Sequence, residues 1–187
     1  VTLGLFTLNQ NGVEGGILQM INHGVITGAL FLCVGMIYER THSRMIKDYG
    51  GLSKTVPVYT VFFTIFTLAA IGLPGMNAFV GEFLIISGAF KANMIIAALS
   101  IIGVVLGVCY MVWLYYRVAL NEINPTTQSS LFDLDSREIA TLAPLVLLVL
   151  LIGLQPNMLL SYMHVSVEHL LEQVHNSVQL ESFNFYE

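Results

Sequence analysis

Charged side chains are scarce in this chain, and their scarcity narrows the class of protein. Only 10% of its 187 residues are Asp, Glu, Lys or Arg and 56% are hydrophobic, whereas a soluble domain carries about 25% charged residues. The formal net charge is −5 and no basic stripe is present, so no nucleic-acid partner is expected. The composition is that of a multi-pass membrane protein surrounded by a lipid bilayer.

Motifs for metals, nucleotides and nucleophilic catalysis are also missing. The two cysteines, Cys33 and Cys109, lie in apolar runs and are interpreted as small helix residues rather than as a disulfide. No CxxC pair or His/Cys cluster indicates a metal site. Because no phosphate loop, nucleotide fingerprint or Ser/His/Asp set is found, neither redox chemistry nor nucleotide binding is expected on this chain.

Long apolar segments are abundant. Five follow one another along the chain: Gly16–Ile37, Val56–Leu73, Met76–Phe90, Asn93–Tyr116 and Ile139–Leu160. Because crossing the hydrocarbon layer takes about 20 helical residues, four of them reach or approach the length of a transmembrane helix. Residues 1–160 are therefore expected to form an all-α membrane domain. Residues 1–8 resemble the end of an earlier helix, which predicts a fragment of a longer polytopic protein.

The tail at 161–187 is predicted to be amphipathic, lying at the membrane surface or against a partner. His164, His169 and His175 occur in it, but their spacing does not place them on one helix face. They are interpreted as solvated side chains rather than as metal ligands.

The segment Met76–Phe90 is too short to cross a bilayer alone, because its 15 residues would form only about 22 Å of helix. Pro74 and Gly75 precede it, Gly81 lies inside it and Gly88 lies near its end. A short apolar segment interrupted by Gly and Pro is typical of the discontinuous helices of transporters. A helix break at these four residues is therefore predicted.

The same segment contains an ionisable residue, Glu82. A charge at the bilayer centre costs about 2.5–3.5 kcal/mol on insertion scales, so such a residue needs a partner or a function. One interpretation is a carboxyl that only locks helix packing through a hydrogen bond or ion pair. The other is a protonatable relay, because burial and neighbouring charges both shift the protonation equilibrium of a carboxyl. The interrupted segment favours the relay.

A polar face runs along Gly16–Ile37, where Gln19, His23 and Thr27 recur every four residues and so share one side of a helix. Imidazole titrates near pH 6.5, which suits proton transfer at neutral pH. The alternative for His23 is a neutral histidine bonded to a carbonyl across a helix interface, and spacing alone does not separate the two. The shared face allows a hydrated path.

The loop at 38–54 holds four of the seven Lys and Arg residues. The positive-inside rule would place it in the cytoplasm. Arg40, His42 and Arg44 at its start are interpreted as anchors at the headgroup boundary.

Three strings, in order and spacing, are similar to those of a known family: Gln19–Gly24, Tyr38–Arg44 and Gly72–Phe83. The chain resembles the C-terminal part of the antiporter-like, M-type subunits of NADH-quinone oxidoreductase (respiratory complex I), which include mitochondrial chain 4. The resemblance covers almost the whole chain and is weakest at 120–138 and in the tail.

The resemblance implies a fourteen-helix antiporter-like fold with two inverted repeats, each containing a discontinuous helix. The five segments would be its tenth to fourteenth helices, with Met76–Phe90 as the discontinuous twelfth. It implies that Glu82 and His23 are proton-relay residues, with Gln19 and Thr27 as further polar residues of the pathway. The glutamate and lysines of the family's first half-channel do not occur in these residues, so only the second half of the pathway is expected. The family's helix count places the loop at 38–54 opposite to the positive-inside expectation, which leaves the orientation open.

The function implied by the resemblance is proton translocation coupled to quinone reduction in a bacterial inner (plasma) membrane. NADH, FMN, iron–sulfur clusters and quinone would be bound by partner subunits, with no cofactor on this chain. The partners would be other membrane subunits of complex I, including neighbouring antiporter-like subunits. The alternatives are a membrane subunit of a multisubunit sodium/proton antiporter or of a membrane-bound hydrogenase, and a purely structural membrane scaffold.

Overall fold

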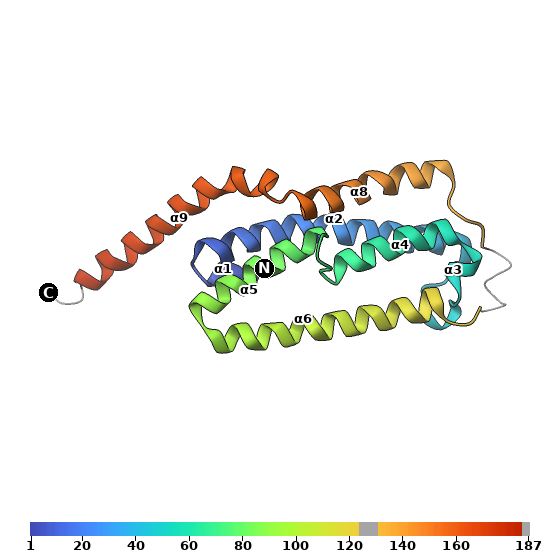
Figure 1. The fold of residues 1–187 in the computed structure, drawn as a ribbon, viewed down its shortest axis with the longest axis horizontal. Helices are drawn as coiled ribbons and strands as arrows, with labels where there is room; N and C mark the ends of the chain where they lie inside the picture. The colour runs from blue at the N-terminus through green and yellow to red at the C-terminus, as the bar shows by residue number, and fades with distance from the viewer. Residues whose placement is uncertain (124–130, 185–187) are drawn as a thin grey trace.

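Every regular element of the described residues is a helix (Figure 1), which confirms the all-α prediction. The computed structural model describes residues 1–123 and 131–184, with side chains through residue 177. In chain order the elements are α1 (Thr2–Phe6), α2 (Gln10–Thr41), η1 (Ile46–Asp48), α3 (Leu52–Thr55), α4 (Pro57–Ala70), α5 (Asn77–Ala92), α6 (Met94–Tyr115), η2 (Tyr116–Leu120), α8 (Ser136–Leu154) and α9 (Asn157–Asn184). Residues 124–130, between the fourth and fifth apolar segments, and residues 185–187 of the predicted tail lie outside the described residues.

Helix α2 is the axis of the bundle. Its 32 residues extend over about 48 Å, beyond both ends of the predicted segment Gly16–Ile37. It begins early because the side chain of Asn9 caps it, accepting a hydrogen bond from the Gly12 N–H at 3.0 Å. It ends at His42, which takes a left-handed conformation with φ 54°. Figure 1 shows α8 on one side of α2 and α4 and α5 on the other.

Helices α4 and α5 are two halves of one interrupted crossing, arranged end to end along α2 (Figure 1). They contain 14 and 16 residues, so each is about 21–24 Å long and shorter than the hydrocarbon layer of about 30 Å. Residues 71–76 between them are not helical, and Gly72 and Gly75 there have φ of +70° and +94°. Pro74 and Gly75 thus lie at the break, as predicted from the sequence.

The structure sharpens the number of crossings. Among the described residues, three helices are long and apolar enough to span a membrane without interruption: α2, α6 with η2, and α8. Together with the interrupted crossing they make four, because Val56–Leu73 is only the first half of the discontinuous helix. If that crossing corresponds to the twelfth helix of the fourteen-helix fold, α2 is the eleventh helix rather than the tenth.

The break predicted at Gly81 and Gly88 is wrong, because α5 continues through both residues. They are packing positions instead. A Cβ on Gly81 would collide with the side chain of Gln19, and one on Gly88 would collide with the backbone of Gly12. Small residues let two membrane helices approach closely, so these glycines bring α5 against α2.

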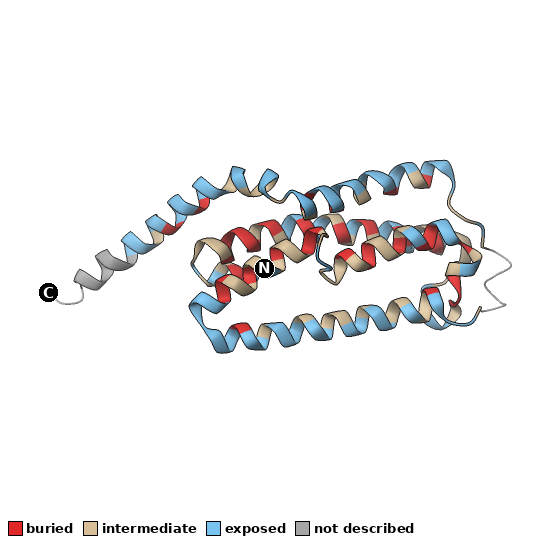
Figure 2. Ribbon diagram, in the orientation of Figure 1, coloured by how far each residue is buried: buried red, intermediate tan, exposed pale blue. Residues whose placement is uncertain are grey.

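Buried residues concentrate on α2, α4 and α5, whereas α6, α8 and α9 are largely exposed (Figure 2). The main core includes Ile26 and Cys33 of α2, Tyr59 and Phe66 of α4 and Leu142 of α8. Exposed apolar side chains on α6 suit contact with lipid or with neighbouring helices.

At one end of the bundle, Arg40 joins α2 to α8. Its guanidinium donates two hydrogen bonds to Glu138, at 2.7 and 2.9 Å, and its side chain is only 5% exposed. It also donates to the carbonyl oxygens of Met36 and Phe132, at 2.7 and 2.8 Å. Arg40 therefore does not act as the free headgroup anchor expected from the sequence. Nearby, the Asp133 carboxylate accepts hydrogen bonds from the first N–H groups of α4, where a negative charge is favoured.

At the other end, α9 follows α8 after a break at Gln155–Pro156, and it passes the end of the bundle (Figure 1). Val167 and Leu171 of α9 are buried against Val13 of α2, so the apolar side of the tail docks on the bundle. The division into a membrane domain at 1–160 and a tail at 161–187 remains a prediction.

Candidate functional site around Glu82

Glu82 lies in the second turn of α5, and its carboxylate reaches back to the break. A Cβ on Gly72 would lie 2.7 Å from Oε2 of Glu82, and the φ of Gly72 is +70°, so glycine is favoured where the carboxylate meets the break. The other oxygen, Oε1, accepts a hydrogen bond from Nε2 of Gln19 at 3.4 Å, which is long for this type of bond. Glu82 itself is half-buried. The sequence-predicted residues Glu82 and Gln19 are thus brought together at the interruption.

Two asparagines that the sequence did not identify as site residues hold Gln19 in place. Asn77 Nδ2 donates to Asn22 Oδ1 at 3.2 Å, and Asn22 Nδ2 donates to Gln19 Oε1 at 3.3 Å and to the carbonyl oxygen of Asn77 at 2.8 Å. Both asparagines are 0% exposed. The chain of donors runs from Asn77 through Asn22 and Gln19 to Glu82, and hydrogen bonds in series polarise one another. It therefore presents only donors to the carboxylate.

The sequence contained only a weak signal for this series of hydrogen-bonded amides. Asn22 lies about 100° around the helix from the neighbouring position His23, away from the face that Gln19 and Thr27 share with it. Asn77 is the first residue of α5. An amide inside an apolar segment needs a partner, but the sequence does not show that these two partner each other.

The structure does not bring His23 and Thr27 to Glu82. His23 is exposed, and the ring has no hydrogen bond to any described residue. The hydroxyl of Thr27 donates to the carbonyl oxygen of His23 at 2.5 Å, which satisfies it within α2. His23 lies one turn beyond Gln19, about 6 Å along the helix axis. A link from His23 to Glu82 would need intervening groups such as water.

A buried carboxyl on α2, Glu14, was missed because the apolar segment Gly16–Ile37 was taken to begin after it. Glu14 is only 7% exposed, and its Oε1 lies 2.6 Å from Nδ1 of His164 on α9. Gln10 also hydrogen-bonds Glu14. The interpretation of His164 as merely solvated is therefore incomplete, since its ring ties the tail to α2.

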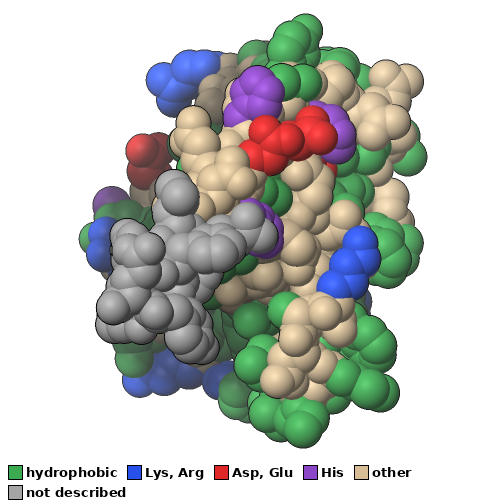
Figure 3. All heavy atoms as spheres, turned by 90° about the vertical axis from the view of Figure 1, so that its left-hand side faces the viewer, with side chains coloured by type: hydrophobic (Ala, Val, Ile, Leu, Met, Phe, Trp, Pro, Cys, Tyr) green, Lys and Arg blue, Asp and Glu red, His purple; other side chains and the backbone are tan. Residues whose placement is uncertain are grey.

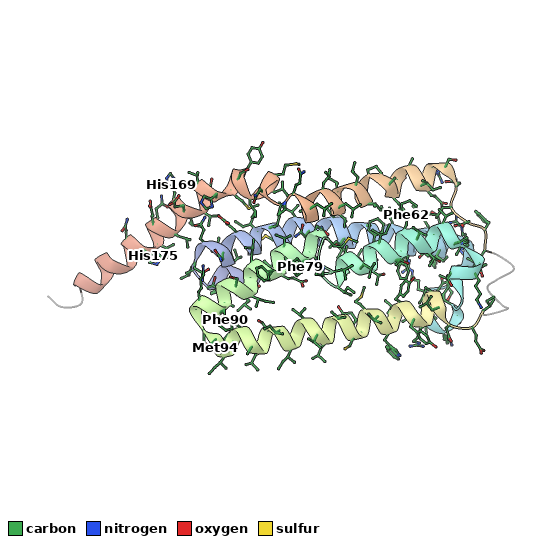
Figure 4. The ribbon with its side chains drawn as sticks, viewed as in Figure 1. Phe62, Phe79, Phe90, Met94, His169 and His175 are labelled. Atoms are coloured by element: carbon green, nitrogen blue, oxygen red, sulfur yellow. The ribbon has the colours of Figure 1, made fainter. Side chains whose placement is uncertain are left out.

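Acidic and histidine side chains gather at this end of the molecule, which Figure 3 views directly. Glu168, Glu172 and His175 line an open hollow there with Gln10. Figure 4 shows His169 and His175 along α9, outside the bundle that contains Phe79 of α5. Within the described residues, no three His, Cys, Asp or Glu side chains converge in a way that would hold a metal ion.

Comparison with known proteins identifies the family. The family model for "NADH:quinone oxidoreductase/Mrp antiporter, TM" matches residues 1–108. NADH-quinone oxidoreductase subunit M of Rhodobacter capsulatus is 46% identical over 175 residues, covering 94% of this chain and 34% of that protein. NADH-ubiquinone oxidoreductase chain 4 of Marchantia polymorpha is 44% identical over 172 residues, covering 92% of this chain and 35% of that protein.

A solved structure agrees with these relatives. A chain of respiratory complex I from Thermus thermophilus with bound NADH superposes with a TM-score of 0.85 at 34% identity, covering 91% of this chain and 36% of that chain. The present chain spans about a third of the length of the curated relatives it matches. It is a multi-pass membrane protein, and it belongs to the transmembrane family of NADH:quinone oxidoreductase and Mrp antiporter subunits.

Proposed function

We propose that this chain provides the second half of a proton pathway in the membrane part of NADH-quinone oxidoreductase, with Glu82 as its relay. One observation carries the proposal: the Glu82 carboxylate lies at a helix interruption and, among the described residues, receives only the Gln19 amide as a hydrogen-bonding side chain. No described Lys, Arg or His forms an ion pair with it. Such a group remains free to change its protonation state.

A second carboxylate of this protein, Glu138, has surroundings that differ from those of Glu82. Glu138 is also a carboxylate within an apolar helix, but Arg40 binds both of its oxygens and the N–H of Asp135 donates to one of them. A carboxylate held in this way is fixed in its charged form and serves packing. Glu82 has one long hydrogen bond and a non-helical backbone beside it. The difference supports a relay for Glu82 and a structural role for Glu138.

Charges on groups near Glu82 would control whether its carboxyl holds or releases a proton. Donors from the amide chain stabilise the carboxylate form, whereas low polarity around it favours the neutral acid. A change of charge on a nearby group then shifts the balance, by 1.36 kcal/mol for each pKa unit. His23, one turn beyond Gln19 on α2, is the proposed preceding station, with water between it and the Gln19 amide. Thr27 contributes polarity on the same face.

The source of energy would lie outside this chain. We infer that NADH, FMN, iron–sulfur clusters and quinone are bound by partner subunits, and that neighbouring antiporter-like subunits pack against this one. The names of the relatives in Rhodobacter capsulatus and Marchantia polymorpha favour complex I. The family also includes Mrp antiporters by its description. Co-purification of the full-length subunit with NADH:quinone reductase activity separates these two assemblies.

The functional test is Glu82→Gln in the full-length subunit within the assembled complex. Proton uptake per NADH oxidised, measured in inverted membrane vesicles, should fall strongly while the complex still assembles. Glu168→Gln is the matched control, because Glu168 is an exposed carboxyl on α9 and its replacement should leave uptake unchanged. Normal proton uptake in Glu82→Gln vesicles would rule out the relay.

A further inference from the structure

Gly153, near the end of α8, lies directly against the interruption between α4 and α5. The end of α8 is beside that junction in Figure 1. A Cβ on Gly153 would lie 2.6 Å from the carbonyl carbon of Met76 and 2.8 Å from that of Gly75, and closer still to the carbonyl oxygen of Gly75. These are backbone atoms, which cannot turn aside as the end of a flexible side chain can. The contact therefore joins the backbone of α8 to the two residues that immediately precede α5.

The backbone conformation at position 153 does not require glycine. Gly153 is part of helix α8, and its φ is not positive, unlike that of Gly75. Glycine is a poor helix former, so the reason for it here lies in packing: a residue without a Cβ lets two backbones approach closely. Leu142 and Val149 of the same helix are buried in the main core. Together with Gly153 they recur at intervals of seven and four residues, so one face of α8 is turned to the interruption.

Helix α8 is tied to α2 on both sides of this contact. At the start of α8, Arg40 of α2 donates two hydrogen bonds to Glu138, at 2.7 and 2.9 Å. Beyond its end, His164 of α9 lies 2.6 Å from Glu14, which is also on α2. Because α8 is held in this way, a side chain added at position 153 would push on the start of α5.

The start of α5 is also the start of the amide chain that ends at Glu82. Asn77 follows Met76 directly, and it exchanges two hydrogen bonds with Asn22, at 2.8 and 3.2 Å. At the far end of the chain, Gln19 reaches Glu82 at 3.4 Å, which is already long for a hydrogen bond. A displacement of less than about 1 Å at the start of α5 is therefore enough to take the carboxylate out of reach of its donor.

We propose that Gly153 is a positioning residue for Glu82. By resting against the backbone of Gly75 and Met76, it fixes where α5 begins and so keeps the amide of Gln19 within reach of the Glu82 carboxylate. Gly153 transfers no proton and acts only through the amide chain. This inference rests on the proposed relay function of Glu82, and it adds helix α8 to the elements on which proton transfer depends.

The first test is Gly153→Ala in the full-length subunit of the assembled complex. The initial rate of NADH-driven proton uptake into inverted vesicles should fall about tenfold, since a misplacement of about 1 Å can cost up to about a hundredfold in rate. The pH dependence of uptake should also shift, because the protonation of a carboxyl responds to the donors that it meets.

Gly88→Ala is the matched control. Its Cβ would lie 2.6 Å from Cα of Gly12, so it too collides with backbone, but near the other end of α5. This variant should lower the amount of folded subunit and leave the pH dependence of uptake as in the wild type. If Gly153→Ala likewise changes only the amount of subunit, with normal uptake for each assembled complex, the inference is overturned.

A double variant shows whether Gly153 acts through the amide chain. Asn22→Leu interrupts that chain, because Asn22 bonds both Gln19 and Asn77. Adding Gly153→Ala to Asn22→Leu should cause little further loss of uptake, since both changes remove the same link. Losses that multiply would contradict the proposal, because they would mean that Gly153 acts by another route.

A milder change on the same helix decides the question if Gly153→Ala does not assemble. Val149 is 0% exposed and belongs to the same buried cluster as Ala78 of α5, so Val149→Ala loosens the packing of α8 near the start of α5. A smaller fall in uptake is expected, with the pH dependence shifted in the same direction as the assay records for Asn22→Leu. Leu147→Ala, at an exposed position of α8, is the control and should pump normally. A wild-type pH dependence in Val149→Ala would overturn the inference.

The relay and the positioning role fail in different ways. If Glu82→Gln abolishes uptake while Gly153→Ala pumps normally, the relay stands and Gly153 does not position it. If Glu82→Gln pumps normally, the relay fails and the positioning role fails with it, whatever Gly153→Ala shows.

Discussion

Gln19 of α2 donates its side-chain amide to the carboxylate of Glu82 on α5 at 3.4 Å, across the contact between a continuous helix and an interrupted one. The amide is held in that orientation because Asn22 donates to the oxygen of Gln19 at 3.3 Å. The position of the carboxylate therefore depends on residues that never touch it.

Replacing Asn22 with leucine should disturb both packing and proton transfer. The change leaves the amides of Gln19 and Asn77 without their buried partner, and each unpaired group costs about 1–3 kcal/mol. A lower midpoint of thermal unfolding and reduced proton uptake per NADH are expected in the assembled complex. Asn11→Leu, on the same helix but with a single 3.3 Å bond to Ser87, should have a smaller effect. Equal effects of the two variants would show that the amide chain does not position Gln19.

Replacing one partner of the ion pair between Arg40 and Glu138 should destabilise the protein more than replacing both partners. Either Arg40→Met or Glu138→Met leaves a buried charge unpaired, at a cost of about 3–5 kcal/mol. The double variant should recover part of the loss, because no charge remains to be neutralised. Thermal unfolding of the four members of a double-mutant cycle measures this coupling. Additive losses in the double variant would mean that the two residues act independently.

Replacement by alanine should have opposite effects on stability at a glycine of α5 and at a glycine of α6. In Gly88→Ala the new Cβ meets the backbone of Gly12, so we expect a loss of about 1–3 kcal/mol from overpacking. In Gly103→Ala the new Cβ meets nothing within 4 Å, and stability should be kept or slightly raised. The amount of folded subunit in membranes reports the difference. Comparable yields from both variants would contradict the close contact of α5 with α2.

Loss of the contact between Glu14 and His164 should release the tail. The two side chains are 2.6 Å apart, and a net contribution of about 0.5–1.5 kcal/mol is expected from such a bond. His164→Ala should therefore raise the rate at which a protease cuts α9 in the native complex. His169→Ala, which changes an exposed residue of the same helix, is the control and should leave the rate unchanged.

Much of the fold followed from composition and segment length, because apolar runs in a bilayer have few alternatives to helices. The break at Pro74 and Gly75 was also predictable, since both residues interrupt helices by local chemistry. The placement of α4 and α5 as halves of one crossing was not, because length alone does not say whether two short helices lie end to end. Gly81 was misassigned because a glycine in a helix serves flexibility and close packing equally well.

The site was predictable only in part. Glu82 stood out because a carboxyl in an apolar run is conspicuous, and Gln19 followed from the spacing along α2. Asn22 and Asn77 did not, since their importance comes from a partner on another helix. The assignment of His23 came from the family resemblance, and its role in the pathway remains a prediction.

As the proposed relay, Glu82 itself must change its protonation state during turnover. Infrared difference spectroscopy of the intact complex, recorded between its oxidised and NADH-reduced states, observes this through the band of protonated carboxyl groups. We predict a difference signal that is lost in Glu82→Gln and retained in Glu14→Gln, which alters a buried carboxyl of α2. Identical carboxyl signals in the wild type and in Glu82→Gln would show that Glu82 is not a proton relay.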